Sequence, residues 1–390
     1  MTRSTNNLHV RVNAPEKRPE GKRVLCYSEA WGKGGIETFL MELFRHHQAM
    51  NFAFTLFSCW DWNTAFDGEL DSLGIDRYTV FPDHKPAQVK RLKEGSNGFA
   101  HLIERIKPDA VYVNTMNGMG FLYAKVAKRM GVPSRIVHSH NSAFGSGNAA
   151  VKAAMHSFGK AALGKNATVR VACSADAGNY LFGNHPYTIV NNGIDTDHFA
   201  YSPSAGGKLR QQFDIPQEAL LFGNVGRIAE AKNPLFQVRT FAEIFLLNPS
   251  AYYLMVGDGE MRPQVEALVE ELSLKDRVIT VGHLSDPSAA YSALDCLLMP
   301  SVFEGLGTVR VEAQCSGCPV LCSEGLPAEA HITDAEAFLP LSAGEEAWAK
   351  KALEMANVNR ERKEYASLVR KAGFDVNDTT RQVVSILQSS

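Results

Sequence analysis

Two glutamates, Glu304 and Glu312, stand eight residues apart where an apolar run gives way to a helical pattern. Gly305 and Gly307 lie between them, and the helical pattern begins near Thr308. This spacing predicts one carboxylate in a strand-to-helix loop and the other about one turn inside the helix. Backbone N–H groups at the start of a helix are a natural seat for phosphate. A carboxylate that accepts from hydroxyl groups, next to such a seat, suits a sugar nucleotide.

Glycosidases also use two carboxylates, so hydrolysis is the first alternative. Retaining hydrolases place the pair about 5–5.5 Å apart and inverting ones about 6.5–9.5 Å apart. Eight residues of ideal helix span about 12 Å. The spacing favours two carboxylates that bind different parts of one ligand. A capped surface helix with two solvated glutamates is the purely structural alternative.

Two cations, Arg227 and Lys232, flank a turn that follows a predicted strand. Asn233 is the expected N-cap of the next helix, and Pro234 suits its first position. A guanidinium can grip a diphosphate at two points, whereas an ammonium acts as a point charge. Together they would neutralise a leaving group with two negative charges; two ordinary surface cations are the alternative.

Glycine turns close other predicted strands. Gly34 and Gly35 would let a phosphate approach the backbone ahead of a helix, although a tight turn is equally consistent. The pattern G-x-G-x-x-G is absent, which argues against nicotinamide binding. Gly257 and the pair His283 and Leu284 end two strands of the second half, as candidate contacts for a base and ribose or as ordinary turns.

A histidine pair and a cysteine group remain. His138 and His140 close a predicted strand and point the same way, which fits a structural role, a sugar-side or acceptor-side contact, or a zinc pair without an evident third ligand. Three cysteines resemble a metal cluster only superficially, and we expect them to be small buried hydrophobic residues. They are Cys315, Cys318 and Cys322.

Short apolar runs that alternate with helical patterns must position these residues. The predicted strands are 24–28, 52–57, 110–114, 135–140 and 169–174, then 220–225, 252–256, 278–281, 296–299 and 319–322. The helical patterns between them include 37–48, 98–106, 234–245 and 261–272. Such alternation predicts an α/β protein with parallel sheets covered by helices on both faces.

The chain is long enough for two domains. We expect a disordered tail over 1–20, an N-terminal domain over 21–197, a C-terminal domain over 198–375, and a final helix within 376–390 that returns to the first domain. Pro203, Ser204, Gly206 and Gly207 suggest a linker at the break.

Composition narrows the function. The net charge of −2 argues against nucleic-acid binding. Residues 1–200 carry +6 and residues 201–390 carry −8, so the first half suits an anionic acceptor or an anionic membrane surface. Seven cysteines without framework spacing, and no signal-peptide pattern or run long enough to cross a bilayer, predict a cytoplasmic protein.

With these motifs in order, the chain from about residue 23 to 375 resembles the retaining family-4 glycosyltransferases, and more narrowly their bacterial exopolysaccharide and capsule branch. The resemblance implies the GT-B fold, in which two Rossmann-like doubly wound domains face each other across a cleft. It implies transfer of a hexosyl unit from a nucleotide sugar, usually a UDP-sugar, to a saccharide or lipid-linked saccharide. The resemblance implies that no cofactor or metal is needed.

The resemblance also implies roles for individual residues. Glu312 would bind the ribose and Glu304 the donor sugar. Arg227 and Lys232 would hold the diphosphate. Backbone groups of Gly34, Gly35, Gly307 and Thr308 would assist them, and His140, with His138 as the alternative, would be the active-site histidine. Gly307 and Thr308 depart from the apolar residues that close relatives often carry there.

Two alternatives stay open. A sugar-nucleotide epimerase on the same fold would convert the donor without an acceptor. A phosphorylase on this fold would need inorganic phosphate and a lysine-bound cofactor, and we find no sign of that cofactor site. A catalytically weak partner subunit of a glycan synthesis complex is the non-enzymatic alternative. The presence of both carboxylates and both cations argues against this non-enzymatic alternative.

Overall fold

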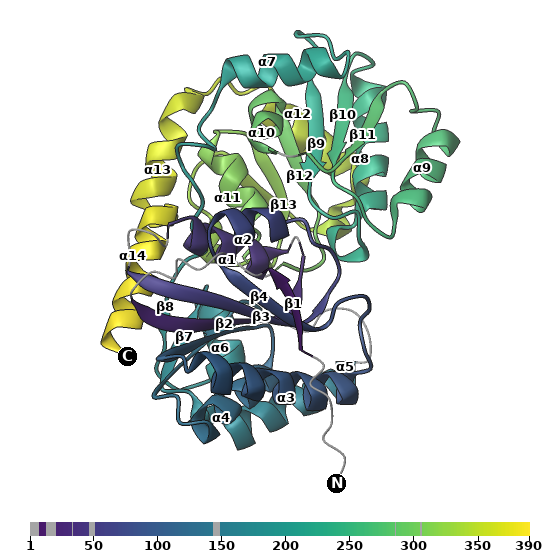
Figure 1. The fold of residues 1–390 in the computed structure, drawn as a ribbon. Helices are drawn as coiled ribbons and strands as arrows, with labels where there is room; N and C mark the ends of the chain where they lie inside the picture. Colours follow the sequence, from purple (N-terminus) through teal and green to yellow (C-terminus); the bar gives the residue numbers. More distant parts are fainter. Residues whose placement is uncertain are drawn as a thin grey trace. The chain divides into compact units, whose positions relative to one another are not determined.

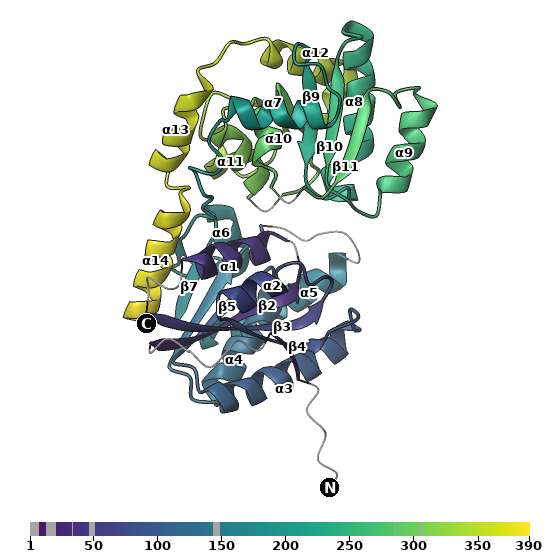
Figure 2. The same cartoon turned by 45° about the horizontal axis from the view of Figure 1, so that its top comes forward.

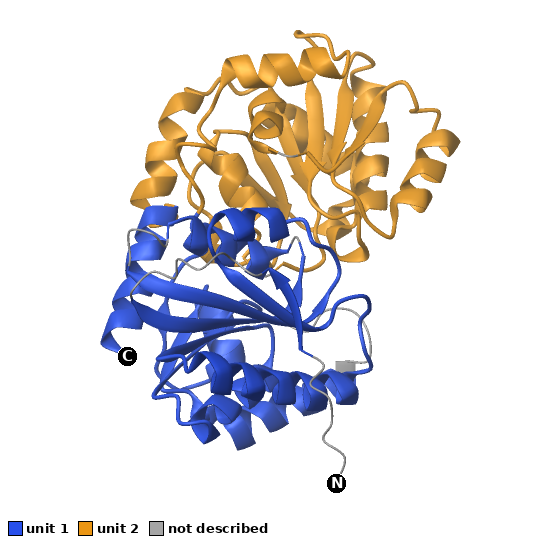
Figure 3. Cartoon of the chain, in the orientation of Figure 1, with its two compact units in different colours: residues 1–193, 376–390 blue, residues 194–375 orange. Residues whose placement is uncertain are grey.

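The computed structural model of the chain describes residues 8–12, 21–32, 34–46, 51–142, 149–284, 286–304 and 306–390. The chain forms two compact units (Figures 1 and 3). The first unit comprises residues 1–193 and 376–390, and the second unit comprises residues 194–375. The chain thus passes from one unit to the other between residues 193 and 194 and again between residues 375 and 376. The expected boundaries were 197/198 and 375/376.

The first unit is built on a sheet that has eight strands within the described residues, in the order β1-β4-β3-β2-β5-β6-β7-β8. Neighbouring strands run parallel except β1, which is antiparallel to β4. The strands are β1 (His9–Val12), β2 (Lys22–Trp31), β3 (Phe52–Asp61), β4 (Asp76–Phe81), β5 (Ala110–Thr115), β6 (Ser134–Ser139), β7 (Val169–Ala172) and β8 (Thr188–Ile189).

Helices cover both faces of this sheet because successive strand residues point to opposite sides. In β2, Leu25 and Tyr27 join a core with α3 and α4, whereas Val24 and Cys26 join a core with α1 and α14. Figures 1 and 2 show α1 on one side of the sheet and α3 and α4 on the other. The helices are α1 (Gly35–Arg45), α2 (Asp67–Ser72), α3 (Gln88–Ile106), α4 (Phe121–Arg129), α5 (Ala149–Phe158), α6 (Ala175–Phe182) and α14 (Val376–Ser389).

The second unit has a fully parallel sheet, with six strands among the residues described, in the order β11-β10-β9-β12-β13-β14. The strands are β9 (Leu221–Val225), β10 (Tyr252–Val256), β11 (Val278–Gly282), β12 (Cys296–Met299), β13 (Val320–Ser323) and β14 (Glu336–Leu339). The helices are α7 (Pro203–Gln212), α8 (Pro234–Leu247), α9 (Arg262–Glu271), α10 (Ser288–Ala293), α11 (Thr308–Cys315), α12 (Gly344–Ala356) and α13 (Tyr365–Lys371). One core packs under α8, α9 and α12, and another under α7, α10 and α11.

Helix α14 follows the second unit in sequence but packs on the first. Val383 and Leu387 are buried in the core beside α1. The Lys22 ammonium donates to the backbone carbonyls of Leu387 and Ser390 at 2.6 and 2.7 Å. The end of the chain is therefore anchored to the start of β2.

Two expectations are wrong. Residues 9–12 are not a disordered tail but strand β1: Val12 is buried, and Arg11 pairs with Asp61 at 3.3 Å. Residues 1–7 and 13–20 lie outside the described part. The expected linker at 203–207 opens α7 instead. The Ser202 hydroxyl accepts from the Ala205 N–H, and a β-carbon on Gly206 would stand 2.7 Å from a backbone carbonyl of α10.

Across the described segments, no helix combines the length and the apolar character that crossing a bilayer would demand.

Candidate functional site

Three glycines end neighbouring strands of the second unit and leave that edge of the sheet without side chains. Gly226, Gly257 and Gly282 follow or close β9, β10 and β11 with φ angles of 137°, 136° and 67°. The Gly257 N–H donates to the Gly282 carbonyl at 2.7 Å. A β-carbon on Gly257 would stand 1.9 Å from the Gly226 carbonyl oxygen. At Gly257 the backbones press together so closely that only glycine fits, whereas at Gly226 and Gly282 it is the positive φ angle that favours glycine. A flat ligand can lie on the bare peptide groups there.

His283 and Leu284 continue directly from Gly282. The His283 side chain is exposed, and Leu284 packs partly on the core beneath α10. This places two of the predicted base and ribose contacts next to the glycine edge.

The loop from β9 to α8 carries the two predicted cations. Arg227 is exposed, directly after Gly226, and takes part in side-chain interactions of its own. Lys232 closes a 3₁₀ turn, Glu230–Lys232, and Asn233 follows with a left-handed φ of 52° as the residue before α8. Asn233 and Pro234 occupy the N-cap and first positions, as the sequence predicts, but the Asn233 side chain makes no capping hydrogen bond.

Lys232 and Glu304 form an ion pair, although 71 residues separate them in the chain. The Lys232 ammonium donates to Oε1 of Glu304, and the Ser301 hydroxyl donates to the same oxygen at 2.7 Å. The Glu304 side chain is 8% exposed and that of Lys232 25%. The pair is therefore held firmly but remains open to a ligand on the lysine side.

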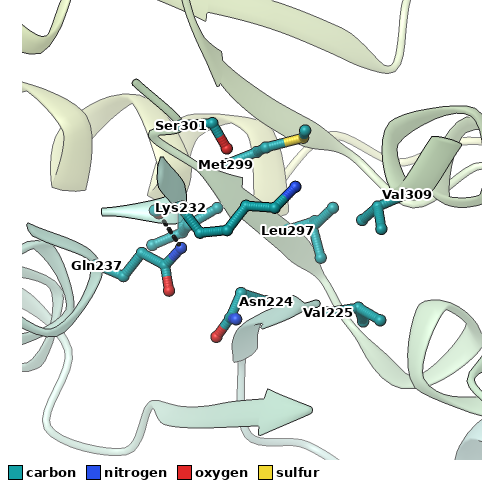
Figure 4. Close-up of a pocket in the computed structure, with 9 residues that line it drawn as sticks. Asn224, Val225, Lys232, Gln237, Leu297, Met299, Ser301 and Val309 are labelled. Carbon is teal, nitrogen blue, oxygen red and sulfur yellow. Dashed lines mark hydrogen bonds between the residues drawn. The ribbon is translucent and has the colours of Figure 1, made fainter. Parts of the chain in front are cut away.

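Lys232 and Ser301 also line a small cavity (Figure 4). The Gln237 amide donates to the Lys232 carbonyl at 2.9 Å, which fixes the backbone that carries the ammonium. The side-chain amide oxygen of Asn224, Oδ1, is buried there without a hydrogen-bond partner among the described protein atoms. The other lining residues are mostly apolar: Val225, Leu297, Leu298, Met299, Ser301 and Val309.

Helix α11 begins beside Glu304 with no side chain that caps it. Its N-cap is Gly307, with a φ of 76°, and Thr308 is the first helical residue. A β-carbon on Gly307 would lie 3.1 Å from Met299 Cε and would strain the backbone. The first N–H groups of α11 can therefore donate to a ligand. Gly305 lies outside the described residues.

Glu312 lies inside α11, apart from Glu304, and has its own partner. The buried Tyr291 hydroxyl on α10 donates to Glu312 Oε2. Burial, and then the Glu312 charge, raise the pKa of Tyr291 well above its ordinary value, so the phenol stays protonated and keeps donating. The two predicted carboxylates thus have different partners: Glu304 pairs with Lys232, and Glu312 accepts from Tyr291.

In the first unit, the glycine turn after β2 opens helix α1. Gly34 is its N-cap and Gly35 its first residue, with open space where a Gly35 β-carbon would stand. Glu37 folds back to this turn: its Oε2 would lie 2.4 Å from a Gly34 β-carbon, and its Oε1 accepts from the Ser28 hydroxyl at 3.2 Å. This negative charge weakens the case for a phosphate at Gly34 and Gly35 and favours a neutral, hydroxyl-bearing ligand.

The two histidines at the end of β6 lie side by side, with ring centroids 3.9 Å apart. His138 is completely buried, and its Nδ1 lies 2.7 Å from the Tyr112 hydroxyl. His140 is slightly exposed, and its Nε2 lies 2.9 Å from Asn114 Oδ1. Asn114 Nδ2 faces two backbone carbonyls, so Oδ1 must accept and His140 Nε2 must carry the proton.

Both imidazoles are neutral for a physical reason. Burial lowers the pKa of His140 to about 3, and burial followed by the nearby His140 charge lowers the pKa of His138 well below its usual value. His140 Nδ1 keeps a lone pair without a partner among the described atoms. His140 therefore cannot act as a general acid near neutral pH, and its unpaired acceptor atom, Nδ1, is buried from solvent.

Within the described ranges, no three His, Cys, Asp or Glu side chains gather as metal ligands. Cys315, Cys318 and Cys322 are all buried, and burial raises the pKa of each thiol. They behave as core residues.

Two family models match successive parts of the chain. "Glycosyltransferase Family 4" matches residues 33–198, and "Glycosyl transferases group 1" matches residues 207–372. The chain belongs to the family-4 glycosyltransferases. The boundary between the two matches falls close to the crossing between the two units.

Relatives of this family-4 glycosyltransferase include the putative glycosyltransferase EpsF of Bacillus subtilis, 27% identical over 95% of this chain and 97% of that protein. A UDP-Gal:alpha-D-GlcNAc-diphosphoundecaprenol alpha-1,3-galactosyltransferase of Escherichia coli is 28% identical over 35% of this chain and 36% of its own. A 2-deoxystreptamine glucosyltransferase of Streptomyces kanamyceticus is 39% identical over 34% and 35%.

Solved structures share the fold of this family-4 glycosyltransferase, which is GT-B. HepE from Anabaena, solved in complex with UDP and glucose, aligns with a TM-score of 0.75 over 94% of this chain and 99% of its own, at 18% identity. Sucrose-phosphate synthase from Thermosynechococcus elongatus aligns with a TM-score of 0.76 over 94% and 98%, at 17% identity.

The structure of this family-4 glycosyltransferase brings Lys232 into contact with Glu304 and keeps Glu312 apart with Tyr291. Sequence patterns missed Tyr291, Ser301 and Asn114 because each acts through a partner brought near by folding. The assigned roles of the site residues remain predictions.

Proposed function

We propose that this family-4 glycosyltransferase moves a hexosyl unit from a nucleotide sugar, first of all a UDP-sugar, to a saccharide or lipid-linked saccharide acceptor. The process it would serve is exopolysaccharide or capsule synthesis. The observation that carries the proposal is the Lys232–Glu304 pair beside the uncapped start of α11. A cation, a carboxylate and free helix N–H groups in one place match a sugar joined to a diphosphate.

The donor fits along the carboxyl edge of the second sheet. Glu312, aimed by Tyr291, accepts from the ribose hydroxyls. The base lies on the glycine edge at Gly257, next to His283 and Leu284. The diphosphate extends from there toward the loop between β9 and α8 and the start of α11.

Two cations and a helix start share the diphosphate charge. Glu304 holds the Lys232 ammonium in place. Lys232, Arg227 and the first N–H groups of α11, at Gly307 and Thr308, together offset the charge of the diphosphate. Lys232 then orients the phosphate, and Glu304 accepts from a donor-sugar hydroxyl through Oε2, because Oε1 already accepts from Lys232 and Ser301.

Transfer proceeds with retention of configuration and without a divalent metal. The bond between the sugar anomeric carbon and the diphosphate oxygen breaks, and the acceptor hydroxyl attacks from the face that the diphosphate leaves. The acceptor proton passes to the departing phosphate oxygen, so no protein base is required. Arg227 and α11 supply the positive charge that a metal would otherwise provide, so we expect a chelator to leave turnover unchanged.

We assign His140 the role of orienting a substrate hydroxyl rather than protonating it. Its neutral ring donates from Nε2 to Asn114, and Nδ1, which is buried without a partner among the described atoms, is the acceptor that a substrate hydroxyl would reach on binding. We assign that hydroxyl to a sugar, with His138 and Tyr112 packed behind it as support.

The names of relatives support the choice of substrates to test. HepE was solved with UDP and glucose, and the Escherichia coli relative is named for transfer from UDP-Gal to a diphosphoundecaprenol-linked sugar. With a lipid-linked acceptor, the reaction takes place at the inner membrane surface. The positive charge of residues 1–200 suits an anionic bilayer.

Charge removal tests the proposal. We expect Arg227→Ala and Lys232→Ala each to lower turnover at least about 100-fold, the loss typical of removing one strong electrostatic stabiliser. Lys275→Ala, which removes an exposed lysine that pairs with Glu270, is the matched control and should keep full activity. Transfer rates of both site variants within a few fold of wild type would refute the phosphate role.

A further inference from the structure

A long stretch of the first unit is almost free of acidic residues. Residues 110–194 contain eight lysines and arginines but a single acidic residue, Asp176, which lies in the first turn of α6. The basic residues are Lys125, Lys128, Arg129, Arg135, Lys152, Lys160, Lys165 and Arg170. Their excess positive charge is larger than the net +6 of residues 1–200. A field of this sign raises the concentration of anions at the surface of the unit.

A cavity of about 340 Å³ opens within this acid-poor stretch. Two cations, Lys160 and Arg170, line it together with His185. Among the residues that the structure describes, no aspartate or glutamate lines it. Its apolar floor consists of buried side chains from the start of α4 and the end of α6, namely Phe121, Leu181 and Phe182. The cavity therefore combines positive charge with an apolar surface.

A close approach of two glycines places Lys160 at this cavity. A β-carbon on Gly159 would stand 2.2 Å from the Gly118 carbonyl oxygen, so the end of α5 lies directly on the turn before α4. The chain then forms a π-helical turn, Gly159–Leu163, a feature that is frequent at functional sites. Within this turn the Lys160 ammonium donates to the Tyr180 carbonyl at 2.5 Å. The position of the charge is thus fixed at the end of α6.

Neither cation of the cavity faces a carboxylate. Arg170 is half-buried on β7, and its guanidinium makes no ion pair or hydrogen bond with the residues that the structure describes. By contrast, buried Arg77 and Arg310 pair with carboxylates at 2.9 and 3.0 Å. Burial lowers the pKa of Lys160, because its ammonium is incompletely hydrated. Both charges therefore gain from an anion that enters the cavity.

The chemistry of the lining selects a phosphate ester. A guanidinium can hold two oxygens of a phosphate group, and an ammonium adds a point charge. The rings of Phe121 and Phe182 meet edge to face below these charges, with centroids 6.1 Å apart. Such a floor suits the carbon skeleton that carries the phosphate, and the volume is in the usual range of small-molecule sites. Nucleic acid suits it less, because buried rings cannot stack on bases.

We propose that the cavity lined by Lys160, Arg170 and His185 binds the phosphate group of a phosphate ester, either a soluble small molecule or the headgroup of an anionic phospholipid. This site goes beyond the proposed transfer reaction, because it lies on the other face of the sheet from the histidine pair. Arg170 pairs with Val137, whose side chain packs on the side of α3 and α4. His138 and His140 instead contact Phe39 of α1, on the opposite face.

Two probes test the site and separate the two sources. Glycerol 3-phosphate is titrated into the full chain by calorimetry at constant ionic strength, and vesicles of phosphatidylcholine and phosphatidylglycerol are sedimented with it. Arg170→Gln and Lys160→Met should each weaken the binding of the effective probe at least about fivefold. Lys128→Gln removes the same charge from an exposed position on α4 outside the cavity. This matched control should change binding less than about twofold.

The variants should keep the fold. Arg170→Gln gives up no hydrogen bond or ion pair with the described residues, so its melting temperature should equal that of the wild type. In Lys160→Met the Tyr180 carbonyl keeps a donor, His156 Nε2 at 3.1 Å. The Gly118 N–H donates to the other nitrogen of that ring at 3.1 Å, so Nε2 carries the proton.

Binding of either probe that depends on Arg170 supports the site, and the probe that binds identifies the source. No binding of either probe by the wild type would overturn the proposal. An equal loss in Lys128→Gln would also overturn it, because it would show a diffuse basic surface. An oligonucleotide that binds through Arg170 when both probes fail would assign a different anion. In each case nucleotide-sugar binding should be unchanged in Arg170→Gln, so the transferase proposal is tested separately.

Discussion

Acid should destabilise the first unit through His140, because its imidazole is buried neutral. The pKa of this ring falls from 6.5 to about 3 on burial. Between these two values the unfolded chain binds a proton that the folded unit does not. The contribution of the neutral His140 ring to the free energy of unfolding is therefore fully present above pH 6.5. This contribution is lost progressively as the pH falls toward 3.

The magnitude follows from the two pKa values. Lowering the pH from 7 to 5 should remove about 2 kcal/mol of stability through His140 alone. His138 acts in the same direction, because burial lowers its pKa as well. The stability lost through these two histidines adds to the stability that proteins ordinarily lose in acid when their carboxylates are protonated.

His140→Gln isolates the effect, because glutamine can still donate to Asn114 from the position of Nε2 but cannot take up a proton. Urea unfolding at pH 7 and pH 5, followed by tryptophan fluorescence, reports mainly on the first unit, which holds Trp31, Trp60 and Trp62. We expect the loss between the two pH values to be about 2 kcal/mol smaller in this variant.

His185→Gln, which removes an exposed histidine of the same unit, is the matched control and should lose stability with pH as the wild type does. A pH dependence of His140→Gln equal to that of the wild type would show that His140 is protonated in the folded unit, and the argument for a neutral ring would fail.

Three further predictions concern packing and binding. Gly257→Ala should destabilise the second unit by about 2 kcal/mol or more in urea unfolding, because the added β-carbon meets a backbone carbonyl at 1.9 Å. Arg77→Met should destabilise the first unit by about 3 kcal/mol, because buried Asp61 then keeps only Ser58 and the partly exposed Arg11 as partners and Asp67 loses its ion pair with Arg77; a loss below about 1 kcal/mol would contradict this. Tyr291→Phe should raise the KM for the nucleotide sugar several-fold with little change in kcat, since Glu312 loses the hydroxyl that aims it, and an unchanged KM would count against the ribose role.

Local sequence patterns predicted the elements that are locally encoded. The apolar runs at 110–114 and 252–256 are strands β5 and β10 because both are buried in parallel sheets. Glu304 and Glu312 fall in the loop and inside helix α11 because Gly307 marks the start of that helix.

Missed elements share a different cause. Strand β4 begins with Asp76 and Arg77, which look like surface residues, yet Arg77 is fully buried against two aspartates. Strand β1 is short and gains its stability from the edge of β4. The start of α7 reads as a linker until Gly206 is seen to lie against α10. In each case a distant partner, absent from the local pattern, decides the structure.

The candidate site likewise contains residues that the sequence indicated and contacts that only the fold creates. Residue types at strand ends suggested Lys232 and Glu304 separately, but their contact depends on the folding of 71 intervening residues. Tyr291 gave no signal, because a tyrosine in a short apolar helix is indistinguishable from a core residue. The GT-B fold and the family are confirmed, whereas the donor, the retention and the roles of single residues stay predictions.

Thermal unfolding with a panel of nucleotide sugars tests the central claim most directly, because a ligand that binds only the folded chain raises its melting temperature. We predict that at least one nucleotide sugar, a UDP-sugar first, raises the melting temperature of the wild type and that Lys232→Ala loses this shift. The account would be contradicted if no nucleotide sugar raised the melting temperature, or if the shift survived in Lys232→Ala and in Arg227→Ala alike.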